Sequence, residues 1–246
     1  MKLNCWAYSL SLFLQSSLSD ELASLRADRA ADWPYELLRF LRGSKWELDK
    51  AREMYRTYHT WRREKRIDTL YDPDVPPFNA ELLGRIVGSN AAGEDKEGRP
   101  LYIEKSGGLH VDGMLSLFTD EDIMRAHVWQ QEHSCARAME TSKRLGKKVE
   151  NFTQILDLDG LSSAHQRAIK FTKEIVAKDS IYYPERLGHL FVVNPPWIFP
   201  VLWKLVKGWI DPVTRAKIHV IKGDPKETLL EYIDASQLPA EVRGGK

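Results

Sequence analysis

The chain has 246 residues, of which 43% are hydrophobic and 29% are charged, and its formal net charge at pH 7 is +1. This composition excludes a disordered chain and provides for one substantial core. The balanced charge gives no global field for holding nucleic acid or an anionic membrane, so any such attraction must come from local patches. Two cysteines, Cys5 and Cys135, establish no disulfide framework and suit a reduced compartment.

The first 19 residues carry a mixed signal. Lys2 precedes a mostly apolar run over residues 3–14, which faintly resembles a signal peptide. Polar residues interrupt that run, and no small-x-small cleavage site follows it, so a packed or frayed helix is favoured. No apolar stretch of the sequence approaches the roughly 20 residues of a membrane span.

Residues 20–70 are predicted to form a helical N-terminal unit. A short helix is expected from Glu36 to Arg42, with a break at Gly43 and Ser44. A second, amphipathic helix follows to Arg66, because its apolar residues recur every three or four positions. Residues 36–66 contain ten Lys or Arg and five Asp or Glu, a local net charge of +5. Such a face is usually only solvated, but it could also meet anionic lipid headgroups.

Residues 72–77 are rich in Asp and Pro and predict a linker, after which residues 78–246 form a second, larger domain. Strand and helix patterns alternate through it. We expect strands at 85–88 and 99–104 around a turn-rich stretch at 90–98, a helix at 120–145 with Thr119 as N-cap, a strand at 153–158, a helix at 163–182, a buried strand at 190–193, a helix at 197–210 and a buried strand at 217–221. Strands separated by helices predict an α/β fold with a mainly parallel sheet.

Catalytic signatures are missing, since the sequence contains no nucleophile elbow, no phosphate-binding loop and no dinucleotide fingerprint. His127 and His133 are six residues apart, with Glu132 between them, and this spacing does not align metal ligands on one helical face. Asp157 and Asp159 end a strand, where two acids could bind a cation, but a turn or capping role is favoured. We therefore expect no catalytic residue, no metal and no cofactor.

The most unusual segment is 197–210. Ten of its fourteen residues are large and apolar, and it holds three of the eight tryptophans. At 1.5 Å per residue it would span roughly 21 Å, too short for a bilayer. A helix that is apolar all round is either an ordinary central helix or a lid that touches lipid. The second interpretation would place Trp and Lys at the level of lipid headgroups.

Five motifs follow one another in the sequence over about residues 35–245. They are Leu37-Leu38-Arg39-Phe40-Leu41-Arg42-Gly43-Ser44-Lys45-Trp46, Gly98-Arg99-Pro100-Leu101-Tyr102, Tyr182-Tyr183-Pro184-Glu185-Arg186-Leu187-Gly188, Val192-Val193-Asn194-Pro195-Pro196 and Ile210-Asp211-Pro212-Val213-Thr214-Arg215-Ala216-Lys217-Ile218. In this order they resemble the CRAL-TRIO lipid-binding family, in its phosphatidylinositol/phosphatidylcholine transfer branch.

This resemblance implies a helical N-terminal unit beside an α/β lipid cage that is closed by a mobile gate helix. The gate falls on the same apolar segment, and the expected gate and membrane contacts are Trp197, Phe199, Leu202, Trp203, Val206 and Trp209. The family's headgroup residues match Glu185, Thr214 and Lys217, with Lys45 a weaker match. Their chemistry is suitable, because a carboxylate accepts hydrogen bonds from inositol hydroxyls while hydroxyl and ammonium groups donate to phosphate.

Two positions depart from the transfer branch. Ser44 stands where a basic pair would begin, so one headgroup cation is missing. Phe152 and Gln154 replace the serine and threonine that contribute to choline-lipid binding. Phosphatidylcholine is therefore not expected as the second ligand, and a different hydrophobic ligand could take its place.

The sequence as a whole predicts a carrier and not an enzyme. It would enclose one phospholipid, phosphatidylinositol, and exchange it during transient contact with a membrane surface. We expect a cytoplasmic, peripheral and monomeric protein that binds no nucleic acid. Two alternatives stay open: a scaffold or signalling module that keeps the fold without lipid transfer, and a carrier of a sterol, tocopherol or retinoid.

Overall fold

The computed structural model describes residues 33–70 and 80–238. The apolar start of the chain and the predicted linker at 72–77 lie outside this description. Within it, no helix combines the length and the hydropathy needed to cross a bilayer. The described residues divide into two compact units, 33–69 with 178–185, and 70–177 with 186–238.

The first unit is helical, as predicted. It contains α3 (Trp33–Gly43), α4 (Leu48–Glu64) and the start of α5 (Ile67–Leu70). Helices α3 and α4 share a core in which the Phe40 ring lies 5.2 Å from the rings of both Tyr55 and Tyr58. The other buried members are Leu37, Leu38, Leu41 and Ala51. The periodic apolar residues of the sequence therefore form this core.

The second unit contains a five-stranded sheet in the order β1-β2-β3-β4-β5. Its strands are β1 (Ser89–Glu94), β2 (Pro100–Glu104), β3 (Phe152–Asp157), β4 (Leu187–Val193) and β5 (Ile218–Val220). Strands β1 and β2 pair antiparallel, and the remaining pairs are parallel. The predicted α/β class with a mainly parallel sheet is confirmed, because helices cross over between the parallel strands.

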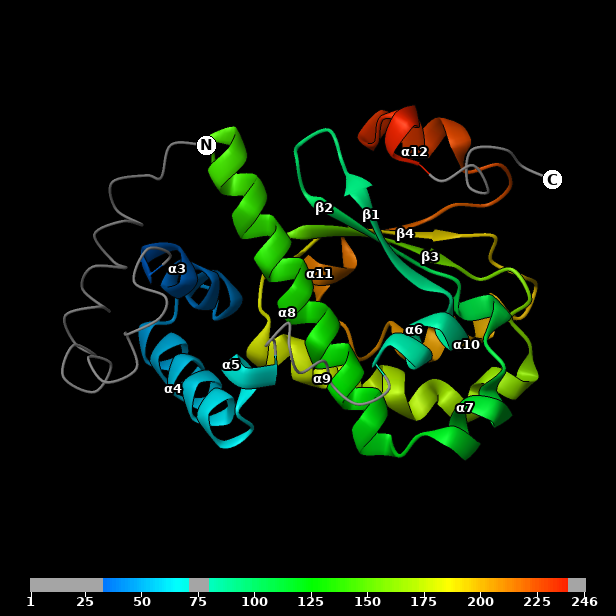
Figure 1. Ribbon diagram of the computed structural model, residues 1–246, viewed down its shortest axis with the longest axis horizontal. Coiled ribbons are helices and arrows are strands. Elements are labelled where there is room, and N and C mark those ends of the chain that lie inside the picture. The colour runs from blue at the N-terminus through cyan, green and yellow to red at the C-terminus, as the bar shows by residue number, and fades with distance from the viewer. Residues whose placement is uncertain (1–32, 71–79, 239–246) are drawn as a thin grey trace. The chain divides into compact units, whose positions relative to one another are not determined.

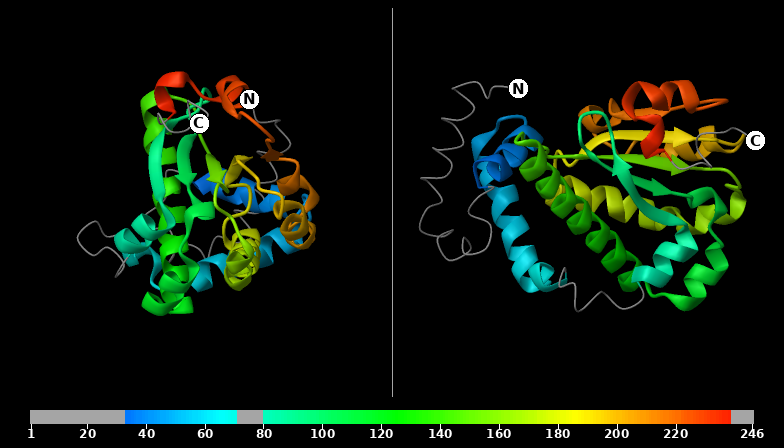
Figure 2. Two further views of the ribbon diagram at one scale, coloured as in Figure 1. Left: turned by 90° about the vertical axis from the view of Figure 1, so that its right-hand side faces the viewer. Right: turned by 45° about the horizontal axis from the view of Figure 1, so that its top comes forward.

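Helices cover both faces of this sheet (Figures 1 and 2). In Figure 1, α12 lies above the strands, and α7 and α9 lie below them. The bounds are α6 Ala80–Val87, α7 Val111–Leu117, α8 Asp120–Leu145, α9 Ile169–Tyr182, α10 Phe199–Val206, α11 Pro212–Arg215 and α12 Lys226–Tyr232, with short 3-10 turns at η2 Ser106–Gly108, η3 Ser163–Ala168 and η4 Ala235–Gln237. Thr119 caps α8 as predicted, in a reciprocal capping box with Asp122.

The upper face of the sheet is closed by a continuous apolar core. Leu101, Ile155 and Phe191 come from three neighbouring strands, and their side chains lie on the same face of the sheet. They pack with Leu229 of α12 and with Ile233. A separate cluster lies under the sheet, among α6, α7, α8 and α9; it contains Leu83, Met114, Phe118, Ile123 and Phe171. The two faces of the sheet are therefore covered by two separate apolar clusters.

Four predicted elements need correction. Residues 85–87 are not a strand but the end of helix α6, since the spacing of Leu82, Leu83 and Ile86 is helical and buries Leu83. The first strand is instead β1, and it occupies much of the stretch at 90–98 that was predicted to be turn-rich. The strand predicted at 217–221 is shorter, and all three residues of β5 are half-buried because β5 lies at one edge of the sheet. The helix expected over 197–210 spans only Phe199–Val206.

Candidate functional site

Glu185 lies in a turn whose neighbouring residues contact α3 and α4 of the first unit. The carbonyl oxygen of Pro184 accepts a hydrogen bond of 3.0 Å from Nη1 of the buried Arg39. The ring of Tyr182 stacks on Trp61 with a centroid separation of 4.1 Å. Glu185 itself has a positive φ of 59°, in the left-handed region that non-glycine residues seldom adopt. Helices α3 and α4 therefore fix the backbone from which this carboxylate projects.

Lys45 is also in the first unit, on the turn between α3 and α4. It is exposed and has a φ of 56°. The preceding Ser44 is fully buried, and its hydroxyl donates to the carbonyl oxygen of Leu41 over 3.0 Å. A basic side chain at position 44 would have to lose its charge or disrupt this packing. Ser44 therefore makes a buried contact at the end of α3.

Thr214 and Lys217 lie together in one turn of the second unit. Asp211 caps helix α11 and accepts hydrogen bonds from the backbone N–H groups of Val213 (2.9 Å) and Thr214 (3.0 Å). The N–H of Lys217 donates to the carbonyl oxygen of Thr214 over 3.0 Å. Burial alone would raise the pKa of Asp211, but the hydrogen bonds from Thr214 and Val213 and the charge of Lys217 hold it below its usual value. The turn presents one hydroxyl and one ammonium group beside an ionised carboxylate.

The four predicted headgroup residues therefore occupy two places. The structure brings Thr214 and Lys217 together, and it places Lys45 and Glu185 in the first unit.

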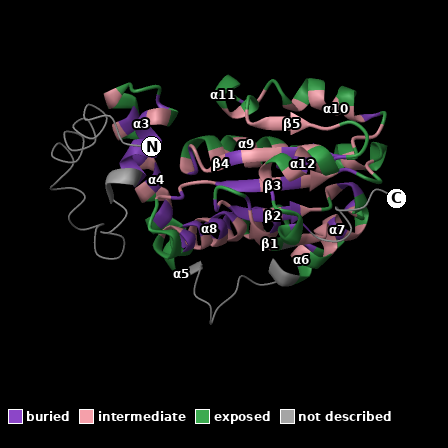
Figure 3. Ribbon diagram, turned by 90° about the horizontal axis from the view of Figure 1, so that it is seen from above, coloured by how far each residue is buried: buried purple, intermediate pink, exposed green. Residues whose placement is uncertain are grey.

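Helix α10 is the most apolar helix described, and none of its residues is buried. Figure 3 shows α10 and α11 in the colours of exposed and intermediate residues, whereas β2 and β3 are largely buried. The most exposed large apolar side chains of this segment are four residues apart: Trp197, in the turn before α10, is 88% exposed, and Val201 and Leu205 on the helix are 66% and 49% exposed. We call these three residues the exposed stripe. Two buried isoleucines, Ile198 and Ile210, flank the helix.

The predicted gate residues divide into different environments. Trp197 is exposed, whereas Phe199, Leu202, Trp203, Val206 and Trp209 are half-buried. The rings of Phe199 and Trp203 stack with centroids 5.9 Å apart. Trp209 lies outside the helix, with the Lys173 ammonium group 6.0 Å from the centre of its ring. Val201 and Leu205, which the sequence reasoning missed, belong to the exposed stripe; their spacing from Trp197 was the available signal.

The lower face of the sheet carries polar side chains in an interior position. Tyr102 and Gln154 face one another across β2 and β3, and Glu104 is next along the same face. Glu104 accepts hydrogen bonds from the Ser106 hydroxyl and, over 3.4 Å, from the Gln154 amide. Burial raises the pKa of Glu104, against the opposing effects of Ser106 and His127. Sequence reasoning identified Gln154 but missed Glu104, because only the strand register brings them together.

Phe152 also projects to this face, and it is buried at the start of β3. Neither it nor Gln154 offers a hydroxyl group.

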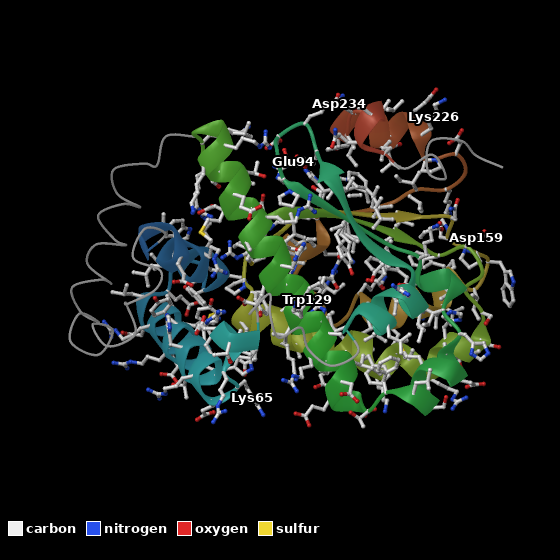
Figure 4. The ribbon with its side chains drawn as sticks, in the orientation of Figure 1. Lys65, Glu94, Trp129, Asp159, Lys226 and Asp234 are labelled. Atoms are coloured by element: carbon white, nitrogen blue, oxygen red, sulfur yellow. The ribbon has the colours of Figure 1, made fainter. Side chains whose placement is uncertain are left out.

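The remaining polar candidates have structural roles. Oδ1 of Asp157 accepts from the Asn194 amide (2.8 Å) and from the backbone N–H of Asp159 (3.0 Å), which is the turn role favoured from the sequence. Asp159 lies where β3 ends (Figure 4). Across residues 33–70 and 80–238, no three His, Cys, Asp or Glu side chains gather in a way that could hold a metal ion.

Comparison with known proteins adds three findings. The sequence pattern of the family described as CRAL/TRIO domain matches residues 90–244. The chain is 33% identical over 210 residues to the SEC14 cytosolic factor of Eremothecium gossypii, covering 85% of this chain and 68% of that protein. It is 35% identical over 235 residues to the phosphatidylinositol/phosphatidylcholine transfer protein SFH4 of Arabidopsis thaliana, covering 94% of this chain and 38% of that protein.

The fold also resembles a solved structure, the crystal structure of Sfh5. The TM-score is 0.72 at 17% sequence identity, and the match covers 92% of this chain and 84% of the other. This likeness concerns the fold alone.

Proposed function

Because this chain belongs to the CRAL/TRIO domain family of lipid-binding and transfer proteins, as its motifs indicated, we propose that it carries phosphatidylinositol between membranes. Membership in this family also agrees with the prediction of a carrier and not an enzyme. We propose that the protein works as a monomer at the cytoplasmic surface of membranes, in keeping with the name cytosolic factor that its fungal relative bears.

The observation that carries the proposal is the exposure of α10. An apolar helix without a buried residue is unfavourable in water, because each Å² of exposed apolar surface costs about 25 cal/mol relative to burial. At a bilayer the same surface is favourable. Helix α10 is therefore suited to a protein that alternates between water and a membrane.

The two sides of this segment suit two contacts. Trp197, Val201 and Leu205 would enter the membrane interface, with the exposed Lys204 and Lys207 at headgroup level. The half-buried side, which includes Phe199, Leu202, Trp203 and Val206, would cover the acyl chains of the bound lipid. Ile198 and Ile210 are the buried points about which the helix would move.

The lower face of the sheet would form the floor under the lipid. Its Tyr102, Leu156 and Leu190 are half-buried, whereas Leu101, Ile155 and Phe191 on the opposite face are fully buried. Each acyl CH₂ that is buried contributes about 0.8 kcal/mol. Because the lipid leaves a similar environment in the bilayer, this term nearly cancels, and exchange requires only that the helix opens at the membrane.

For the headgroup phosphate we propose the turn that holds Thr214 and Lys217, whose hydroxyl and ammonium groups would donate to it. Glu185 and Lys45, in the first unit, are separate proposals as headgroup contacts, with the Glu185 carboxylate as an acceptor for inositol hydroxyls. Phe152 and Gln154 lack the hydroxyl groups for a choline-lipid phosphate, so phosphatidylcholine is not proposed as the second ligand.

The test is to extract lipids from the purified full-length protein and identify them by mass spectrometry. We expect phosphatidylinositol in the wild type and several-fold less in Lys217→Ala. The matched control is Lys222→Ala, which removes an exposed lysine just beyond β5 and should leave the lipid content unchanged.

The outcomes separate the alternatives. Undiminished phosphatidylinositol in Lys217→Ala would remove that residue from the site. A sterol, tocopherol or retinoid in the extract would replace the proposed cargo, and a protein without any lipid would favour the scaffold hypothesis.

A further inference from the structure

Two histidines on neighbouring strands are joined by a hydrogen bond. Nδ1 of His189 in β4 lies 3.1 Å from Nε2 of His219 in β5. Both rings are half-buried and lie among the rings of Phe191 and Tyr232, with centroid separations from 4.8 to 5.8 Å within this group of four. This is the only side-chain hydrogen bond shown between β4 and the edge strand within the described residues.

The hydrogen bond has a defined proton requirement. One ring must donate its N–H while the other presents a lone pair. A first added proton can reside on an outer nitrogen and leaves the bond intact, although it places charge in an aromatic environment. A second proton leaves two N–H groups facing one another, and the bond is then lost. The pair therefore titrates as a unit with two steps.

The surroundings disfavour protonation of the pair. Burial lowers the pKa of His189, as do Arg99 and His219, while Asp95 and Glu97 act in the opposite direction. Burial also lowers the pKa of His219. The other charged groups on the packed elements are Lys217 beside β5, Lys96 on the β1–β2 turn, and the exposed Lys226, Glu227 and Glu231 of α12.

The sign of the pH effect follows from these shifts. An unfolded histidine titrates near pH 6.5. Since both folded pKa values are lowered, the opened strand binds protons first as the pH falls. The stability that the pair contributes is complete above about pH 6.5 and decreases as the pH falls towards the lowered values.

We propose that His189 and His219 form a proton-sensitive latch that holds strand β5, and with it the Thr214–Lys217 turn, on the sheet. Strand β5 has three residues and begins directly after Lys217. Backbone hydrogen bonds of 2.9 Å join it to β4 at both ends, from Leu190 N–H to the Lys217 carbonyl and from Ile221 N–H to the Val192 carbonyl. Protonation of the pair loosens this short ladder and the turn that precedes it.

The consequence for lipid rests on the proposed function. If Thr214 and Lys217 bind the headgroup, acid conditions weaken lipid retention by releasing their turn.

The experiment compares the full-length wild type with the double variant His189→Gln, His219→Gln, which cannot titrate at these positions. Amide hydrogen exchange of Leu190 and Ile221 is measured by NMR at about pH 7.5 and about pH 5.5 and corrected for intrinsic chemistry. We expect exchange in the wild type to quicken by roughly tenfold at the lower pH, and in the double variant to stay constant. The control is His165→Gln, which replaces a histidine of η3 outside the pair. Amide exchange in this variant should have the same pH dependence as in the wild type.

If amide exchange of Leu190 and Ile221 depends on pH equally in the wild type and the double variant, the proposed latch is overturned. If the double variant does not fold, the ring signals of the wild type decide. Two lowered and interacting titrations support the latch, and two independent titrations near pH 6.5 overturn it.

Lipid retained at both pH values is measured on the same samples. A wild type that loses β5 protection in acid but keeps its phosphatidylinositol overturns only the link to lipid. A chain that carries no phosphatidylinositol at either pH overturns the proposed function, while the exchange data still decide the latch.

Discussion

Single buried groups in this protein organise the turns that join its strands. Oδ1 of Asp95 accepts hydrogen bonds from the backbone N–H groups of Glu97 and Arg99, both 2.9 Å. Oδ2 accepts a hydrogen bond from the Thr153 hydroxyl at 2.7 Å and lies 3.1 Å from Nη1 of the Arg99 guanidinium. One side chain thus closes the β1–β2 turn and joins it to β3.

Asp95→Ala is expected to destabilise the second unit by about 2–4 kcal/mol, because it leaves the Thr153 hydroxyl and part of the Arg99 guanidinium buried without partners. Urea unfolding followed by circular dichroism measures the loss. Glu97→Ala is the control, since its ion pair with Arg99 is on the exposed side and should contribute no more than about 0.5 kcal/mol. Equal effects of the two variants would contradict this account.

Gly107 and Gly108 in η2 give a second comparison between neighbouring residues. A β-carbon on Gly107 would overlap the backbone of Leu158 and Asp159, whereas one on Gly108 would meet no atom within 4 Å. Gly107→Ala should therefore cost several kcal/mol by separating η2 from the end of β3, roughly the range for severe overpacking. Gly108→Ala should be neutral within about 0.5 kcal/mol or slightly stabilising. Thermal unfolding of the pair measures the difference, and a tolerated Gly107→Ala would show that these segments separate easily.

For single residues, the sequence identified the local motifs to which they belong, but not the residues that they contact. Glu185, Thr214 and Lys217 were identified because they lie in recognisable local motifs, and their roles stay predictions. The Glu104–Gln154 and His189–His219 contacts could not be identified, because each depends on the register between strands that are distant in sequence. A shift of one residue would send either side chain to the other face of the sheet.

Among the elements, α10 differs most from expectation. Its composition predicted an apolar helix over fourteen residues, but the regular helix has eight. Composition alone could not locate its ends, because Gly208 and Pro200 are the only breaking residues and Pro is tolerated in a first turn. Helix α6 was mistaken for a strand for a related reason: short apolar runs fit both periods, and only burial of Leu83 distinguishes them.

The exposed residues of α10 allow a prediction about lipid transfer and membrane binding. Val201→Glu with Leu205→Glu should abolish lipid transfer between vesicles and strongly reduce vesicle binding, because charged residues are expelled from the membrane interface. Folding should be unaffected, since both side chains face solvent. Transfer of labelled phosphatidylinositol and vesicle flotation measure the two effects.

Leu117→Glu is the matched control for this variant. Leu117 is 60% exposed on α7, so the same change alters exposed apolar surface at another element. It should retain transfer. Loss of transfer in both proteins would indicate a general effect of surface charge, and retention in both would exclude the α10 stripe from membrane contact.

For the whole molecule, the alternating pattern of strands and helices was enough to predict the fold class, because right-handed crossovers leave few other arrangements. The division of the chain into these two units could not be predicted in full from the sequence. Residues 178–185 pack with α3 and α4 although more than a hundred residues separate them in sequence. That contact depends on Arg39, a buried charge whose Pro184 partner no local pattern reveals.

A carrier that encloses its lipid should also be more stable against unfolding with the lipid bound than without it. Ligand that binds only the folded state adds RT ln(1 + [L]/Kd), about 2.7 kcal/mol at a hundredfold excess over Kd. For a chain of this size that corresponds to an increase in Tm of roughly 5–11 °C. Delipidated protein should melt lower by this amount in calorimetry, and short-chain phosphatidylinositol should restore the Tm. Phosphatidylcholine of the same chain length should not restore it, and Lys217→Ala should respond less than the wild type. An equal response to both lipids would show that the acyl chains alone, without the inositol headgroup, determine what this interior accepts.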